Sequence, residues 1–272
     1  MTDQNRVTTA LLLAAGTGSR SRPMTNDAPK CLTEVGGVPI LERLVNNLRE
    51  QEFERLVVVI GHMGDQIRDF LNKYANDMQI DYVHSAAYRT TNNIYSLWLA
   101  REHIREPFLL LESDLVFDTS MLGDMLDPDK IAISLIRPWM NGTTVTVTPD
   151  KRVNAFHVGS GGENDRARYK TVNIYSLSTQ TWNETVTRLD RYISDGKVGG
   201  YYEAVFAELV TDGAISFEAS FFDPDRWYEI DTTTDLGEAE RIFGTSRPFA
   251  TPDVRRLQPA ERGSLPSIIP ND

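Results

Sequence analysis

The chain has 272 residues, of which 40% are hydrophobic and 25% are charged, and its formal net charge is −11. This length allows one large α/β domain or two small ones with a substantial core, and the composition is ordinary for a soluble globular protein. The negative charge argues against a general binder of nucleic acids or anionic membranes, because both would repel it. The single cysteine, Cys31, excludes an intrachain disulfide. The N-terminus has no apolar signal core, and no apolar run is long enough to span a membrane. These features and the single cysteine predict a cytoplasmic protein.

The first part of the chain alternates between strand and helix patterns. Residues 7–15 have apolar side chains on both faces, as expected of a central parallel strand. The same reasoning predicts helices at 39–51 and 65–74 and strands at 56–60 and 80–83. Strands and helices that alternate through short connections predict a doubly wound, mostly parallel sheet.

The second part is richer in β-patterns. We expect a helix from 92 to 105, strands at 108–111, 131–136, 143–148, 152–158 and 170–176, helices at 179–194 and 201–211, strands at 214–220 and 227–230, and a closing helix at 233–243. Residues 158–165 have the composition of a flexible loop. Residues 244–272 are rich in proline and lack periodicity, which predicts a tail that is disordered or lies over the body or a partner subunit.

One segment near the start combines features of a phosphate site. The apolar run ends in Gly16-Thr17-Gly18-Ser19-Arg20-Ser21-Arg22-Pro23, and Lys30 follows shortly afterwards. Glycines allow backbone N–H groups to approach phosphate oxygens, and arginine offers a planar fork of donors. The alternative is a glycine-rich turn followed by a solvated basic loop. Two glycines and three cations so close to a buried strand favour the phosphate site.

The pattern LAAGxGSRxxP…PKxL resembles the signature of the sugar-nucleotide type of nucleotidyltransferases, which join a nucleoside monophosphate to an acceptor and release pyrophosphate. No GKS or GKT follows, as a P-loop would need, and GxGxxG is absent. The resemblance implies a Rossmann-like mixed, mostly parallel sheet flanked by helices, formed by one domain over residues 1–243. It also implies a small β-rich insert for the acceptor at about 137–215, and Mg²⁺ as a cofactor.

Three further segments narrow the resemblance. These are Asn92-Asn93-Ile94-Tyr95-Ser96-Leu97, Gly200-Tyr201-Tyr202-Glu203 and Tyr228-Glu229-Ile230-Asp231. With the opening motif they resemble the branch that contains CTP:phosphocholine and 2-aminoethylphosphonate cytidylyltransferases, over about residues 8 to 243. This branch implies transfer of CMP from CTP to a small phosphonate or phospho-alcohol.

Two aspartates follow apolar strands. Asp114 ends FLLLESD, and Asp231 lies just beyond the strand at 227–230. Ligands of open α/β sheets bind beyond the carboxyl ends of strands, although either aspartate could instead cap a turn or a helix. The resemblance assigns both to Mg²⁺, which carboxylates and phosphate oxygens commonly hold. It assigns Arg20 to the β- and γ-phosphates and Lys30 to the α-phosphate and the incoming anion.

The resemblance also implies two binding surfaces. For the nucleotide it gives Leu13, Ala14, Ala15, Gly16, Gly18, Gly61, Tyr88, Asn92, Asn93, Ser96 and Glu112. For the acceptor we expect Arg137, Lys170 and Asn173 at the phosphonate, and Tyr201, Tyr202 and Glu203 at a cationic head group. The asparagine pair could equally form a turn and helix cap, and either tyrosine could pack a helix end. The choline enzymes carry a tryptophan that is missing here, which favours a primary amine or a hydroxyl.

The expected partners are therefore CTP and a small phosphonate or phosphate acceptor, with 2-aminoethylphosphonate favoured, and neither nucleic acid nor membrane. Phosphocholine stays an alternative acceptor, as does a sugar or inositol phosphate with UTP, dTTP or CTP. A non-catalytic nucleotide-binding regulator is the alternative from another class, but the retained Arg20, Lys30, Asp114 and Asp231 count against it. The histidines lack metal-type spacing and no GxSxG is present, so no other catalytic set emerges. The sequence does not decide whether CTP or UTP is preferred, or whether the protein is a monomer or a homodimer.

Overall fold

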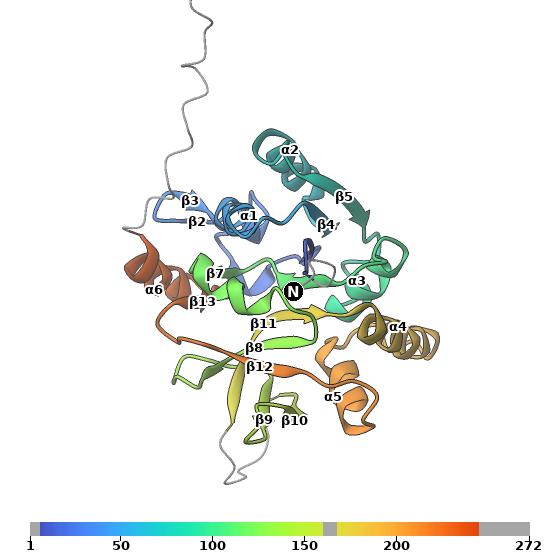
Figure 1. The fold of residues 1–272 in the computed structure, drawn as a ribbon. Coiled ribbons are helices and arrows are strands. Elements are labelled where there is room, and N and C mark those ends of the chain that lie inside the picture. Colours follow the sequence, from blue (N-terminus) through green and yellow to red (C-terminus); the bar gives the residue numbers. More distant parts are fainter. Residues whose placement is uncertain (1–5, 160–167, 245–272) are drawn as a thin grey trace, which may run out of the picture.

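The computed structural model describes residues 6–159 and 168–244 (Figure 1). Most of the loop predicted at 158–165 and nearly all of the tail predicted at 244–272 lie outside these residues. The strands are β1 (Thr9–Ala14), β2 (Glu34–Val35), β3 (Val38–Pro39), β4 (Arg55–Ile60), β5 (Gln79–His84), β6 (Phe108–Glu112), β7 (Leu115–Phe117), β8 (Lys130–Leu135), β9 (Thr144–Val147), β10 (Val153–His157), β11 (Tyr169–Leu177), β12 (Glu218–Phe222) and β13 (Trp227–Glu229). The helices are α1 (Ile40–Glu50), α2 (Gly64–Tyr74), α3 (Asn93–Leu99), α4 (Thr179–Ser194), α5 (Glu203–Thr211) and α6 (Thr233–Phe243).

A nine-stranded mixed sheet forms the centre of the molecule, with the order β10-β9-β11-β6-β1-β4-β5, and β8 pairs both β11 and β12. Strands β6, β1, β4 and β5 are parallel, whereas β11 runs antiparallel to β6. The carboxyl ends of the four parallel strands therefore meet at one edge of the sheet. This mixed sheet with flanking helices confirms the predicted fold class.

Helices cover both faces of the sheet, because the strand residues alternate between two cores. Leu12 belongs to a core with residues of α1 and α2, whereas its neighbours Leu11 and Leu13 belong to a core with residues of α3, α4 and α5. The apolar run at 7–15 is thus buried on both sides, as its composition predicts. Figure 1 shows α4 and α5 beside the strands of the second half of the chain.

Strand β11 changes neighbours along its length. Residues Ile174–Leu177 pair with β6, whereas Tyr169 and Lys170 pair with β9. Its register with β8 shifts between Thr171 and Tyr175, and Asn173 lies there in the left-handed region with φ of 61°. Asparagine tolerates this conformation better than most residues, and such bulges redirect side chains near active sites. The bulge lies between the part of β11 that pairs with β6 and the part that pairs with β9.

A small antiparallel ribbon of β7 and β13 lies beside the main sheet, and the sequence patterns did not predict its first strand. β7 begins directly after the turn that ends β6, so its three residues merge with the FLLLESD run. The pairing aligns Leu115 with Glu229, and the N–H of Ile230 donates to the carbonyl oxygen of Asp114 at 3.0 Å. This ribbon brings the chain around residue 231 to the end of β6.

Two predicted elements differ from the structure. The helix predicted over 92–105 ends at Leu99 and continues as a 3₁₀ turn to Glu102, because tighter turns commonly end helices. The strand predicted at 214–220 begins only at Glu218, since Ile215 and Phe217 are buried in the core as part of a connecting loop. Among the described residues, no helix has the length and apolar character needed to cross a bilayer.

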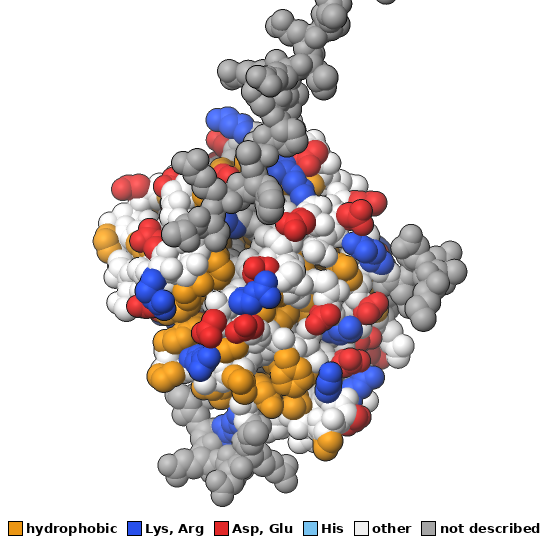
Figure 2. All heavy atoms as spheres, turned by 60° about the vertical axis from the view of Figure 1, so that its left-hand side comes forward, with side chains coloured by type: hydrophobic (Ala, Val, Ile, Leu, Met, Phe, Trp, Pro, Cys, Tyr) orange, Lys and Arg blue, Asp and Glu red, His pale blue; other side chains and the backbone are white. Residues whose placement is uncertain are grey.

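Figure 2 shows one face of the molecule, on which acidic and basic side chains are interspersed and hydrophobic side chains gather in the lower part. In this view the charges of opposite sign lie close to one another. The charges that matter for the site are those inside the pocket at the edge of the sheet.

Candidate active site

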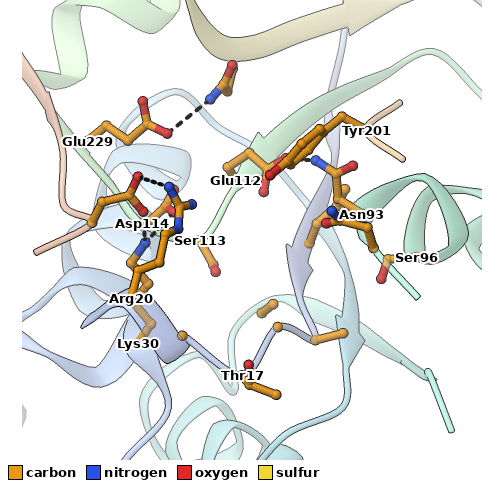
Figure 3. Close-up of a pocket in the computed structure, with 18 of the residues that line it drawn as sticks. Thr17, Arg20, Lys30, Asn93, Ser96, Glu112, Ser113, Asp114, Tyr201 and Glu229 are labelled. Carbon is orange, nitrogen blue, oxygen red and sulfur yellow. Dashed lines mark hydrogen bonds and ion pairs between the residues drawn. The ribbon is translucent and has the colours of Figure 1, made fainter. Parts of the chain in front are cut away.

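The pocket lies beyond the carboxyl ends of β1 and β6 and has a volume of about 550 Å³. Its size falls within the range of small-molecule sites. In Figure 3, Arg20, Lys30 and Asp114 lie on one side of the pocket, and Asn93, Ser96 and Tyr201 lie across from them. The pocket therefore has two opposing walls, one built mainly by the loops after β1 and β6 and one by the starts of α3 and α5.

The glycine-rich loop after β1 forms the floor. Gly18 has φ of +58°, and a Cβ there would lie 2.8 Å from Cγ2 of Thr25. The Thr25 hydroxyl and the N–H of Ser21 both donate to the carbonyl oxygen of Gly18, at 2.8 and 2.9 Å. Glycine is required here because the turn is left-handed and tightly packed. At Gly16, by contrast, a Cβ would meet nothing within 4 Å, so this backbone faces open space in the pocket.

Four charged side chains converge beside that loop. The Nζ atom of Lys30 donates to Oδ2 of Asp114 and to Oδ1 of Asp231, both at 2.7 Å, and Arg20 contacts Oδ2 of Asp231 at 2.9 Å. The side chains of Lys30, Asp114 and Asp231 are only 12%, 18% and 10% exposed. Burial acts to lower the pKa of Lys30, but the two carboxylates outweigh burial and raise that pKa above its ordinary value. The lysine is therefore a fixed positive charge at neutral pH.

The local folds explain why these side chains meet. Lys30 begins a 3₁₀ turn after the buried Pro29, and the β7–β13 ribbon brings Asp231 to Asp114. The hydroxyl of Ser21 also donates to the carbonyl oxygen of Asp231 at 2.9 Å. The predicted alternative of Asp231 as a helix cap is wrong, because Thr232 caps α6 together with Asp235.

The carboxylate pair retains capacity for a further cation. Oδ1 of Asp114 is buried without a hydrogen-bond partner among the described residues, and two oxygens of the pair already share one ammonium nitrogen. Oxygen donors of this kind suit hard divalent cations such as Mg²⁺. The described part of the chain contains no cluster of three or more His, Cys, Asp or Glu residues that could hold a metal alone. Further ligands would have to come from a bound phosphate or water.

The other end of the pocket contains a second group of buried charges. Nζ of Lys170 lies 3.5 Å from Oε2 of Glu229, and Nδ2 of Asn173 donates to Oε1 of Glu229 at 3.4 Å. Glu203 is only 5% exposed, and its Oε2 atom has no hydrogen-bond partner among the described residues. Burial raises the pKa of Glu203 to about 7, and burial likewise raises the pKa of Glu229 despite the opposing charge of Lys170. This end can therefore accept an additional positive charge.

The wall across from Lys30 is formed by Asn93, Ser96 and the end of β6. Nδ2 of Asn93 donates to Oε1 of Glu112 at 3.0 Å. Burial, followed by the charges of Asp114 and Glu203, raises the pKa of Glu112 well above its ordinary value. Asn92 caps α3 by accepting from the N–H of Asn93 at 2.8 Å, so the predicted cap role is real. Both asparagines also line the pocket.

Most of the residues predicted for the site line this pocket. They are Leu13, Ala14, Ala15, Gly16, Gly18, Arg20, Lys30, Tyr88, Asn92, Asn93, Ser96, Glu112, Asp114, Lys170, Asn173, Tyr201, Glu203 and Asp231. The structure thus brings together residues from the start, middle and end of the chain. Their roles toward a ligand stay predictions.

Three predicted residues do not line the pocket. Gly61 packs behind it, where a Cβ would approach the Ala15 carbonyl oxygen to 2.7 Å and Cβ of Tyr88 to 2.8 Å. Arg137 is exposed and pairs with Asp225 at 3.4 Å, so the expectation that it holds the acceptor is not supported. Tyr202 is fully buried in an aromatic cluster, and direct contact of its side chain with an acceptor is therefore a wrong expectation.

Sequence reasoning missed several pocket residues, and Glu229 is the most informative. It lies two positions before Asp231, and residues two apart in an extended segment point to the same side. That spacing could have predicted it. Other missed residues, among them Ser113, Asn141 and Thr143, carry no comparable signal. Trp139 stacks on Tyr228 with ring centroids 4.1 Å apart and does not line the pocket.

Comparison with known proteins gives matches in sequence and in fold. Residues 10–142 match the MobA-like NTP transferase domain. The chain is 29% identical to a CMP-5'-(3-aminopropyl)phosphonate synthase of Streptomyces rubellomurinus over 88% of its length, and it covers 39% of that relative. It is 27% identical to a choline-phosphate cytidylyltransferase of Haemophilus influenzae over 74% of its length, covering 83% of that protein. Several relatives are matched over less than half of their own length.

The fold comparison is broader. The structure of CTP:phosphocholine cytidylyltransferase from Streptococcus pneumoniae superposes with a TM-score of 0.76 at 22% identity, over 88% of this chain and 99% of that one. The inositol-1-phosphate CTP transferase of T. maritima superposes with a TM-score of 0.72 at 20% identity, over 90% of this chain and all of that one. Residues 10–142 thus match the MobA-like NTP transferase domain in sequence, and most of the chain shares the fold of these two solved structures.

Proposed function

We propose that the chain transfers CMP from CTP to a small phosphonate or phospho-alcohol and releases pyrophosphate, with Mg²⁺ as cofactor. The observation that supports this most is the convergence of Lys30, Asp114 and Asp231 beside the glycine-rich floor of the pocket. Relatives named as a phosphonate synthase and as choline-phosphate cytidylyltransferases favour CTP and this class of acceptor.

The proposed reaction is an in-line displacement. An oxygen of the acceptor forms a bond to the α-phosphorus of CTP, while the bond from that phosphorus to the bridging oxygen breaks and pyrophosphate leaves with the electron pair. The acceptor is already an anion at neutral pH, so no strong general base is needed, and the protein has to position the reactants and neutralise charge.

The residues divide this work. Arg20 binds the outer phosphates, and Lys30 stabilises the α-phosphate and the approaching anion as negative charge accumulates. Asp114 and Asp231 would hold Mg²⁺, because their carboxylates lie together and Oδ1 of Asp114 is unpartnered. When bound, Mg²⁺ supplies further charge neutralisation on the phosphates.

The second group of charges favours an acceptor with a primary amine. Lys170 lines the pocket beside Glu229 and would face the phosphonate, and the unpartnered, buried carboxylate oxygen of Glu203 suits an ammonium group. The acceptor that fits this site best is 2-aminoethylphosphonate. Phosphocholine is the second candidate, because the ring of Tyr201 lines the pocket, is 49% exposed, and could face a quaternary ammonium.

A substrate panel tests the proposal. CTP and UTP are each combined with 2-aminoethylphosphonate, 2-hydroxyethylphosphonate, phosphocholine and glucose 1-phosphate, with Mg²⁺ or with excess chelator, and pyrophosphate release is measured. We expect the highest kcat/KM with CTP and 2-aminoethylphosphonate, and no release after chelation. Calorimetric CTP binding without pyrophosphate release from any acceptor would instead indicate a nucleotide-binding regulator.

A further inference from the structure

The start of α3 is attached to the loop that leads into α5, although the two are about a hundred residues apart in sequence. The N–H of Asn92 donates to the carbonyl oxygen of Val198 at 2.9 Å, and its side-chain amide donates to that of Gly199 at 3.4 Å. The N–H of Tyr202 donates to Oδ1 of Asn93 at 3.1 Å. Three hydrogen bonds therefore fix this loop against α3.

Both ends of the Asn93 amide are engaged by the protein. A backbone N–H can only donate, so the atom that faces Tyr202 must be the amide oxygen. The amide nitrogen then faces Glu112, to which it donates at 3.0 Å (Figure 3). Asn93 thus joins the end of β6 to the start of α5.

The residues on either side of Tyr202 form the acceptor end of the pocket. Tyr201 and Glu203 both line the pocket, whereas the Tyr202 side chain is buried beneath it. Glu112 lies opposite Leu13 in the register of β6 with β1, the strand that leads into the glycine-rich loop. The amide of Asn93 therefore spans from the strands of the nucleotide side to the helix that carries Glu203.

Packing alone does not hold the loop in place. A Cβ at Gly196, Gly199 or Gly200 would meet nothing within 4 Å, and Gly196 has φ of +73°. Glycines with open space on the side-chain side have high conformational freedom, which hydrogen bonds must offset for Glu203 to be held in one position.

We infer that Asn93 is a positioning residue for the acceptor, and that it orients Tyr201 and Glu203 instead of reading the nucleoside. This inference deepens the proposed function, since the acceptor is the substrate whose binding it affects. Loss of the amide removes its hydrogen bonds to the Tyr202 N–H and to Glu112, so the start of α5 is held less firmly. Acceptor affinity then falls, while the triphosphate side, formed by other residues, is unchanged.

The test uses Asn93→Ala, with Asn183→Ala as the matched control at an exposed position of α4. In Asn93→Ala we expect the KM for 2-aminoethylphosphonate to rise about tenfold, with kcat at saturating acceptor and the Kd for CTP within about twofold of wild type. Hydrogen exchange of the Tyr202 amide, which donates to Asn93, should be at least about tenfold faster. The control should match wild type in every measurement.

A second variant, Asn93→Asp, keeps an oxygen toward Tyr202 and removes the donor toward Glu112. It should raise the acceptor KM as well, while the Tyr202 amide stays protected from exchange. A tenfold weaker Kd for CTP with an unchanged acceptor KM in either variant would overturn the inference. Wild-type exchange of the Tyr202 amide in Asn93→Ala would also overturn it. Hydrogen exchange needs no turnover, so inactivity with every acceptor would contradict the proposed function alone.

Discussion

The two ends of the pocket balance their charges differently. At the end beside the glycine-rich loop, Asp114 and Asp231 share Lys30, and Arg20 adds a second cation. At the other end, Lys170 is the nearby cation for both Glu203 and Glu229, and the pKa values of both acids are raised. The first end pairs two carboxylates with two cations, and the second end is short of positive charge. This difference suits a triphosphate at one end and an acceptor with a cationic head group at the other.

The largest effect is expected at the first end. Lys30→Ala or Asp114→Ala should lower turnover at least about a hundredfold, because Lys30 would stabilise the transition-state charge directly and Asp114 would do so by holding Mg²⁺. Pyrophosphate release gives the rate, and circular dichroism should show an intact fold. Turnover near the wild-type value in either variant would refute these roles.

The raised pKa of Glu203 at the second end should make the unfolding free energy depend on pH. The pKa of Glu203 is raised from 4.5 to about 7 in the folded protein, so the folded state binds the proton more tightly than the unfolded chain. Its contribution to stability is full below about pH 4.5 and is lost as the pH rises through about 7. Glutamine does not titrate, so the stability of Glu203→Gln should not fall in this pH range. We expect the unfolding free energy of the variant, relative to wild type, to be about 2 kcal/mol more favourable at pH 8 than at pH 5. Urea unfolding at both pH values measures this, and an equal difference at both would contradict it.

Glu203→Gln should also change which acceptor the protein prefers. Glu203→Gln should raise the KM for 2-aminoethylphosphonate about tenfold, because an amide lacks the charge that attracts ammonium. The KM for 2-hydroxyethylphosphonate should change by less than about threefold. Equal changes for both acceptors would show that Glu203 does not recognise the amine.

The smallest effect concerns the floor of the pocket. Gly18→Ala should reduce the unfolding free energy by about 1 kcal/mol, since it places a Cβ in a left-handed turn and against Thr25. Gly16→Ala is the matched control for stability, because its Cβ meets open space. Urea unfolding that gives equal values for the two variants would argue against the tight packing at Gly18.

The difference between the two ends of the pocket also explains which residues could be predicted from the sequence. The first end depends on local signals, because the glycines, Arg20 and Lys30 follow one apolar strand, and Asp114 follows another. The parallel sheet then brings both strand ends to the same edge, a property of the fold class. These residues and the main elements could therefore be predicted from patterns in the chain.

The second end depends on contacts between distant segments. Neither the bulge at Asn173 nor the short strand β7 leaves a periodic signal, and the β7–β13 ribbon determines where Glu229 lies. The burial of Tyr202 beside an exposed Tyr201 follows from which residue faces the core at the start of α5, and two adjacent tyrosines give no indication of this. Arg137 was predicted from its charge alone, and its pairing with Asp225 depends on the loop after β12.

The central claim is that the cationic loop and the two aspartates together bind one metal–triphosphate unit. The most direct test is Mn²⁺ binding, followed by electron paramagnetic resonance, with a non-hydrolysable CTP analogue. The account predicts weak Mn²⁺ binding to the free protein, because Lys30 occupies the space between the carboxylates, and one tightly bound Mn²⁺ per chain once the analogue is added. Asp114→Asn and Asp231→Asn should each abolish the tight binding, whereas tight binding that persists in both variants would contradict the account.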